Sequence, residues 1–183
     1  MTWGALLQPD LVLGGPILQL TLDRLQHYGL KGLVLDVDDT LVPFQSTDPS
    51  DALQAWVASL RPHLKLWLVS NNLSATRIGR IGEALDVPYS LGATKPSRRK
   101  LRQAVQAMGL PVEQVAMVGD RLFTDVLAGN RLGMFTILVE PMVDSGEALR
   151  RSPMRSFEVW LSQRLGVSLN LESGSFSGLG SPD

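Results

Sequence analysis

The chain has 183 residues, of which 44% are hydrophobic and 19% are charged. This length and composition predict one folded domain with a substantial core rather than a disordered chain. The net charge of −1 gives no support for nucleic-acid binding, and the lack of cysteine excludes disulfides and thiolate metal sites. With only His27 and His63, a histidine-rich zinc site is not expected either.

Residues 1–31 are expected to form an arm and a short helix that pack on the core. The first twenty residues are apolar, but they lack a basic signal-peptide segment, and Pro9-Asp10 and Gly14-Gly15-Pro16 interrupt them. A transmembrane helix is therefore not predicted. The apolar residues from Trp3 to Leu13 either fold over the edge of the core or dock on a membrane. We expect a cytoplasmic protein, with peripheral contact at the inner face of a membrane as an open alternative.

Residues 32–167 alternate between predicted strands and helices. Aliphatic runs predict strands at 32–37, 64–69, 87–91, 115–118 and 134–139. Caps and apolar faces predict helices at 48–62, 74–85, 96–108, 124–131 and 153–165, and the short helix of the N-terminal arm at 21–28. This alternation predicts an α/β, Rossmann-like parallel sheet with helices on both faces. The Ser/Gly-rich residues 168–183 are predicted to be a disordered tail.

Several of these helices have recognisable ends. Thr21 and Ser74 are candidate N-caps, and Gly29 is the expected stop after the first helix. Asp48 is a third candidate N-cap, because Pro49 would then occupy the first helical position. The helix predicted at 153–165 carries aromatic residues beside several arginines, and it is a second candidate for membrane contact.

The strand predicted at 32–37 runs into a cluster of three aspartates, Asp36, Asp38 and Asp39. Neighbouring carboxylates repel one another, so such a cluster persists most readily when a cation neutralises it, and oxygen ligands suit Mg²⁺. A calcium loop of the EF-hand type is not supported, because Leu41 and Thr47 replace its glycine and its last glutamate. The alternative is an Asp-rich turn that binds no ligand.

Three further polar segments follow apolar runs: Ser70-Asn71-Asn72, Lys95-Pro96 and Gly119-Asp120-Arg121-Leu122-Phe123-Thr124-Asp125. Ligands of an open parallel sheet bind at the carboxyl ends of its strands, so these segments should converge on one site. With Asp36-Val37-Asp38-Asp39-Thr40 they resemble the four motifs of the haloacid dehalogenase (HAD) superfamily of phosphohydrolases. The resemblance spans about residues 32 to 140.

This resemblance implies a phosphatase that works through an aspartyl-phosphate. Asp36 would be the nucleophile, and Asp38 would protonate the leaving oxygen and later deprotonate the attacking water. Mg²⁺ would be bound by the Asp36 side chain, the Asp38 backbone carbonyl and Asp120, with Asp125 assisting.

The resemblance also implies a phosphate-binding set of Ser70, Asn71 through its backbone N–H, and Lys95, which would contact the nucleophile too. Asp39 matches a variable position of the first motif. Arg98, Arg99, Lys100 and Arg102 follow Lys95 at the start of a predicted helix, where they either bind an anion or form a solvated face.

The intervals between the motifs leave no room for a cap domain, so an open site is expected, suited to a macromolecule or to a lipid headgroup. Within the superfamily the chain resembles the YqeG-like proteins, a capless branch similar to mitochondrial-type phosphatidylglycerophosphate phosphatases (subfamily IIIA). The residues that carry this closer resemblance are Gly32 to Val42, Ala93 to Pro96, Val118 to Asp125 and Gly129-Asn130-Arg131. Those lipid phosphatases carry Lys and Asn where this chain has Val37 and Asp39.

Three functions follow from these observations. The first is hydrolysis of phosphatidylglycerophosphate to phosphatidylglycerol and phosphate, and the second is hydrolysis of soluble nucleotides or sugar phosphates. The third is a non-catalytic protein-binding module that uses the fold as a scaffold. The complete set Asp36, Asp38, Lys95 and Asp120 argues against the third function, because a scaffold does not need all four residues.

Overall fold

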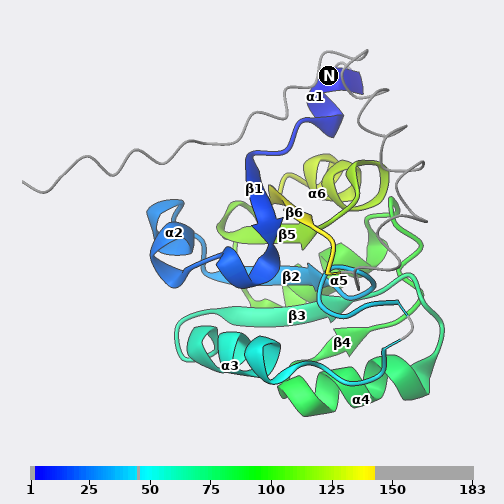
Figure 1. Cartoon of the computed structure of the whole chain (residues 1–183). Coiled ribbons are helices and arrows are strands. Elements are labelled where there is room, and N and C mark those ends of the chain that lie inside the picture. Colours follow the sequence, from blue (N-terminus) through cyan, green and yellow to red (C-terminus); the bar gives the residue numbers. More distant parts are fainter. Residues whose placement is uncertain (1–2, 45, 143–183) are drawn as a thin grey trace, which may run out of the picture.

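The computed structural model describes residues 3–44 and 46–142. The helix predicted at 153–165 and the tail predicted at 168–183 lie outside these residues. The described chain forms a six-stranded sheet in the order β1-β6-β5-β2-β3-β4, with every neighbouring pair parallel (Figure 1). The predicted α/β, Rossmann-like fold is confirmed.

The strands are β1 (Leu11–Pro16), β2 (Gly32–Asp36), β3 (Lys65–Val69), β4 (Tyr89–Ser90), β5 (Val115–Gly119) and β6 (Phe135–Glu140). The α-helices are α1 (Trp3–Leu7), α2 (Leu22–His27), α3 (Asp51–Leu60), α4 (Ala75–Leu85), α5 (Arg99–Met108) and α6 (Leu127–Leu132). Two 3₁₀ turns, η1 (Ile17–Gln19) and η2 (Val112–Gln114), and one π-helical turn, η3 (Leu122–Val126), complete the described elements.

Alternate side chains of the central strands enter two cores, one on each face of the sheet. Every residue of β2 and β5 is buried, as expected for parallel strands covered by helices on both sides. Leu33 and Leu35 pack with residues of α2, α3 and α4 on one face. Val34 packs with residues of α5 and α6 on the other face. These two layers hold β2 and β5 rigidly side by side, so the polar residues that follow them are fixed as well.

The N-terminal arm contributes an edge strand, β1, that was not predicted. Leu11 and Val12 lie opposite Ile137 and Leu138 of β6 in parallel register. The Asp10 carboxylate accepts hydrogen bonds from the backbone N–H (2.8 Å) and the hydroxyl (2.9 Å) of Thr136, which fixes this register. The side chains of Leu7, Leu11 and Leu13 are therefore buried in the protein, whereas Trp3 is 67% exposed.

Of the three predicted N-caps, two are correct and one is wrong. Thr21 accepts a hydrogen bond from Arg24 N, and Ser74 accepts one from Arg77 N, as N-caps do. The Asp48 prediction is wrong, because Ser50 Oγ accepts from Leu53 N (3.2 Å) and α3 begins at Asp51.

Two further helices begin later than predicted. A turn closed by Ser97 N and Thr94 O (2.9 Å) precedes α5, which begins at Arg99. The helix predicted at 124–131 is divided into the π-helical turn η3 and α6. Among the described residues, no helix is long and apolar enough to cross a bilayer.

Candidate active site

The polar segments predicted to converge do meet at one edge of the sheet. Asp36 is the last residue of β2 and lies opposite Val69 of β3, so Ser70 follows at the same level. Asp120 follows β5, the other neighbour of β2. This is the carboxyl edge of the parallel strands, where open α/β sheets bind their ligands.

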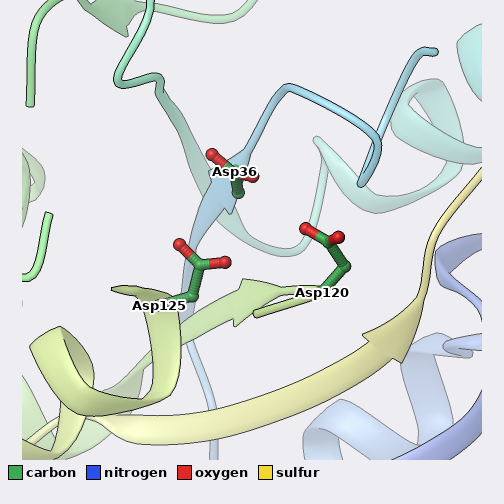
Figure 2. A group of neighbouring side chains, drawn as sticks. All are labelled: Asp36, Asp120 and Asp125. Atoms are coloured by element: carbon green, nitrogen blue, oxygen red, sulfur yellow. The ribbon is translucent and has the colours of Figure 1, made fainter. Parts of the chain in front are cut away.

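Three carboxylates form an acidic cluster at this edge. Oxygen atoms of Asp36, Asp120 and Asp125 all lie within 4.8 Å of one another. Figure 2 shows the three side chains projecting into a common space from β2, from the end of β5 and from η3. Asp36 and Asp125 are buried, and the side chain of Asp120 is 9% exposed.

The π-helical turn η3 aims Asp125 at this cluster. The backbone N–H of Asp125 donates to Arg121 O (3.0 Å), and the carboxylate of Asp125 accepts from Arg121 N (3.2 Å). Gly119 makes room for the side chain, since a Cβ at that position would lie 2.3 Å from Asp125 Oδ2. Asp125 therefore depends on a glycine at the end of β5.

Lys95 is the buried cation of the cluster. Its ammonium group donates to Asp36 Oδ1 and lies 2.7 Å from Asp125 Oδ1. Asn71 holds the backbone of this lysine, because its side-chain oxygen accepts from Lys95 N (2.8 Å) and its amide donates to Lys95 O (3.4 Å). The second and third motifs are thus joined directly beside the first.

The acidic cluster carries more negative charge than Lys95 neutralises. Burial raises the pKa of Asp36 from 3.8 to about 8, although Lys95 opposes the shift, and Asp125 and Asp120 add to it. Burial, followed by repulsion from Asp125, raises the pKa of Asp120 to about 6. For Lys95, burial lowers the pKa but the carboxylates of Asp125 and Asp36 raise it more, so the ammonium stays charged.

This donor set fits a divalent cation. A cation would replace protons in holding the three carboxylates together, and carboxylate oxygens without histidine or cysteine suit Mg²⁺. Asp36, Asp120 and Asp125 are the side chains that could hold it. Thr40 Oγ1 donates to Asp120 Oδ1 (3.1 Å) and so orients one of these candidate ligands. Thr40 was not predicted as a site residue, because a threonine beside an aspartate does not by itself indicate a function.

Asp38 lies beside the acidic cluster but has different partners. Ser70 Oγ donates to its Oδ2 (2.7 Å), and Arg77 Nη1 donates to its Oδ1 (2.5 Å). Ser70 Oγ also accepts from Asn72 N (2.9 Å). The structure thus brings Asp38 and Ser70, two separately predicted site residues, into contact, and it adds Arg77, which was not predicted.

Two other predicted positions have structural partners. Asp39 has a positive φ of 64°, and its Oδ1 accepts from Phe44 N (3.0 Å), so it shapes the loop after β2. Arg98 donates to the backbone carbonyl of Arg131 (2.8 Å). Arg99, Lys100 and Arg102 are not among the residues joined to the acidic cluster in the described chain.

Comparisons with known proteins identify the family of this chain. The profile of the HAD-hydrolase-like family matches residues 92–160. Probable phosphatase YqeG of Bacillus subtilis is 35% identical over 136 residues, which cover 74% of this chain and 78% of YqeG. The chloroplastic phosphatidylglycerophosphate phosphatase 1 of Chlamydomonas reinhardtii is 34% identical over 133 residues, covering 67% of this chain and 49% of that protein. The chain therefore spans about half the length of this algal relative.

A solved structure supports the fold. The crystal structure of a hypothetical protein from Xanthomonas campestris superposes with a TM-score of 0.50 at 20% sequence identity, covering 74% of this chain and 78% of that one. In this chain the four motifs meet at one edge of a parallel sheet. The match to YqeG extends over most of both chains. This chain thus belongs to the HAD superfamily, on its YqeG-like branch, and is a phosphomonoester hydrolase.

Proposed function

We propose that the chain is a Mg²⁺-dependent phosphatase that forms an aspartyl-phosphate at Asp36, with phosphatidylglycerophosphate as its substrate. One observation carries the mechanistic part: a buried Lys95 joins Asp36 to Asp125 within the acidic cluster at the carboxyl edge of the sheet. A lysine held against the nucleophile can contact the phosphoryl oxygens as well, and the remaining carboxylates are placed to hold a metal. We assign the metal to Asp36, Asp120, Asp125 and the backbone carbonyl of Asp38.

In the first half of the reaction a carboxylate oxygen of Asp36 attacks phosphorus. The ester P–O bond breaks, its electron pair leaves with the alcohol oxygen, and that oxygen takes a proton from Asp38. Lys95 holds the other oxygen of Asp36 and so fixes the direction of attack. Bound Mg²⁺ supplies positive charge that offsets the charge of the phosphoryl oxygens.

In the second half a water molecule attacks phosphorus and gives its proton to Asp38. The bond between phosphorus and Asp36 breaks, which releases inorganic phosphate and restores the carboxylate. Ser70, the backbone N–H of Asn71 and Lys95 are the proposed phosphate ligands. Because Ser70 donates its hydroxyl proton to Asp38 here, its hydroxyl must turn before it donates to a phosphate oxygen.

The lipid substrate is supported by the openness of the site and by the relatives. Among the described residues, only α3 lies between β2 and β3, and only α4 lies between β3 and β4, so no inserted domain covers the carboxyl edge there. A relative that matches two thirds of this chain is named for phosphatidylglycerophosphate. The protein would act at the cytoplasmic face of a membrane, through peripheral contact.

A soluble nucleotide or sugar phosphate is the second candidate substrate. Val37 and Asp39 depart from the lipid phosphatases that the first motif resembles, which weakens the lipid assignment without touching the catalytic residues. A non-catalytic binding module has less support, because Asp36, Asp38, Lys95 and Asp120 are all present and all lie at the carboxyl edge of the sheet.

Phosphate release by the purified full chain tests this proposal. Phosphatidylglycerophosphate in mixed micelles is compared with nucleoside monophosphates and sugar phosphates, each with Mg²⁺ and with EDTA. We expect EDTA to abolish release and the lipid to be preferred by about tenfold or more in kcat/KM. Release that EDTA does not affect would contradict the metal assignment, and preference for a soluble ester would contradict the lipid assignment.

A further inference from the structure

Arg77 on α4 links that helix to the loop that follows β2. Its Nη1 donates to Asp38 Oδ1 (2.5 Å), its Nε to Ser46 O (2.8 Å) and its Nη2 to Pro43 O (3.2 Å). The side chain is only 10% exposed, so these contacts are largely shielded from water. Arginine suits this position, because its rigid fork reaches three separate acceptors at once, whereas an ammonium group is a single point of contact.

Both oxygens of the Asp38 carboxylate are held from different elements. Arg77, near the start of α4, binds Oδ1, and Ser70, at the end of β3, binds Oδ2. A carboxylate that accepts a hydrogen bond on each oxygen has one orientation, and rotation about its side chain would break at least one of these bonds. The ion pair with Arg77 is charge-assisted and is the stronger of the two restraints.

We propose that Arg77 is a positioning residue that holds Asp38 by Oδ1, so that Oδ2, which is freed when the Ser70 hydroxyl turns to the phosphate, carries the proton that passes to the leaving oxygen. This inference rests on the function proposed above, in which the ester P–O bond breaks while Asp38 gives its proton to the departing oxygen. Proton transfer requires the donor to lie within hydrogen-bond reach of that oxygen. Among the residues that the structure describes, the hydrogen-bond acceptors of Arg77 are Asp38 and two loop carbonyls and include no member of the acidic cluster, so it acts through Asp38.

The dependence of the rate on the leaving group distinguishes a positioning role from general damage to the protein. A 4-nitrophenolate ion is stable enough to depart without a proton, whereas an alkoxide must be protonated as the P–O bond breaks. A misplaced Asp38 therefore slows transfer of the phosphoryl group to Asp36 much more from an alkyl phosphate than from 4-nitrophenyl phosphate. Hydrolysis of the aspartyl-phosphate is common to all substrates, so the comparison uses kcat/KM, which reports the steps up to departure of the alcohol. General damage to the fold or to metal binding would slow both reactions by the same factor.

The test compares the Arg77→Ala variant with the wild-type chain on 4-nitrophenyl phosphate, phenyl phosphate and glycerol phosphate at saturating Mg²⁺. We expect kcat/KM for glycerol phosphate to fall by about 10- to 100-fold, within the usual contribution of general acid catalysis. The fall in kcat/KM for 4-nitrophenyl phosphate should be less than about threefold, with phenyl phosphate in between. Arg77→Lys should restore part of the lost kcat/KM, because its ammonium can still pair with Asp38 but cannot also bind both carbonyls.

A double variant checks that Arg77 acts through Asp38. Asp38→Asn should give the same dependence on leaving group, and Arg77→Ala added to Asp38→Asn should cause no further loss, since residues that act as a unit are not additive. Arg80→Ala is the matched control: Arg80 lies one turn further along α4 and pairs with Asp48 (2.9 Å), with side chains 59% and 68% exposed. It should leave all three reactions unchanged.

Equal losses of kcat/KM on all three substrates, or an additive loss in the double variant, would overturn the positioning role of Arg77 while the proposed function stands. If Arg77→Ala does not fold, Arg77→Gln, which keeps a long stem and a donor, must show the same dependence on leaving group. A wild-type chain that hydrolyses none of the three esters with Mg²⁺ would overturn the proposed function, and this inference with it.

Discussion

Lys95 is the residue on which the electrostatics of the site depend. Its ammonium group contacts Asp36 and Asp125, but Asp120 has only Arg121 as a cationic partner in the described chain, at 3.9 Å and with a half-exposed side chain. One buried ammonium therefore faces three carboxylates. Without a metal, part of the remaining negative charge is removed by protons, which is the physical meaning of the raised pKa values.

The first prediction follows from this proton uptake: the metal-free protein should lose stability as the pH rises from about 4 to about 8. The pKa of Asp36 is about 8 in the folded protein against an ordinary 3.8, so the folded state holds a proton that the unfolded chain has released. A folded state that binds more protons becomes less stable with each rise in pH. Mg²⁺ competes with these protons, so its stabilising effect should be larger at pH 8 than at pH 5.

Thermal unfolding with EDTA and with Mg²⁺ at both pH values provides the measurement. The Asp36→Asn variant is the control, because it removes the most perturbed carboxylate. In EDTA at pH 8 it should be more stable than the wild type by at least about 1 kcal/mol, which is about 2–4 °C for a chain of this size. A metal-free protein that is most stable at pH 8, with the same Mg²⁺ effect at both pH values, would contradict this.

The residues of the site differ in how far the sequence predicted them. Asp36, Lys95, Asp120 and Asp125 stand in motifs, and the structure brings all of them together. Arg77 lies 39 positions from Asp38, and nothing in the sequence of α4 distinguishes it from Arg80, which pairs on the surface. The contact between Arg77 and Asp38 could therefore not be predicted from the sequence.

At the scale of elements, the turn η3 decides where Asp125 lies. A regular α-helix was predicted from residue 124, but the chain forms a π-helical turn first and enters α6 only at Leu127. Such turns are concentrated at functional sites and have no reliable sequence signature. The close approach of Asp125 to Gly119 is the contact that depends most directly on this geometry.

The second prediction concerns this contact: Gly119→Ala should weaken Mg²⁺ binding by about tenfold or more, with a loss of activity. A methyl group at Gly119 would lie 2.3 Å from Asp125 Oδ2 and 2.6 Å from its Cβ, so the aspartate must move away from Lys95. Displacing the groups that orient ligands costs about 10- to 100-fold in metal affinity. The dependence of Tm on Mg²⁺ concentration measures the affinity without relying on turnover.

Gly15→Ala is the matched control for this variant. Its methyl group would also overlap a neighbour, Gln19 Oε1 at 2.4 Å, but that neighbour is the end of an exposed side chain that can move. The Mg²⁺ titration of Gly15→Ala should match that of the wild type. The geometric role of Gly119 would be refuted by a Gly119→Ala variant that titrates in the same way as the wild type.

Strand β1 could not be predicted from the local sequence. The segment 11–16 contains Gly14, Gly15 and Pro16, which argue against a strand, and only pairing with β6 and the bonds of Asp10 to Thr136 make it one. An edge strand of this kind is stabilised by tertiary contacts rather than by local preference. Local signals were sufficient at Thr21 and Ser74, because an N-cap bonds within its own turn.

At the scale of the whole molecule, the parallel sheet explains why motifs far apart in sequence form one site. β2 lies between β3 and β5, so the carboxyl ends of these strands place Asp36, Ser70 and Asp120 side by side. The alternation of strands and helices predicted this convergence. It did not predict the side-chain orientations, which place Asp38 with Ser70 and Arg77 and place Asp36 with Lys95.

Phosphoryl transfer to Asp36 is tested most directly by trapping the intermediate. The wild-type chain, turning over 4-nitrophenyl phosphate with Mg²⁺, is quenched in acid, digested with pepsin and analysed by mass spectrometry. One phosphoryl group is expected on the peptide that contains Asp36, with none in EDTA and none in the Asp36→Asn variant, which should also be inactive. A phosphoryl group on any other residue, or turnover by Asp36→Asn at the wild-type rate, would contradict the assignment of Asp36 as the nucleophile.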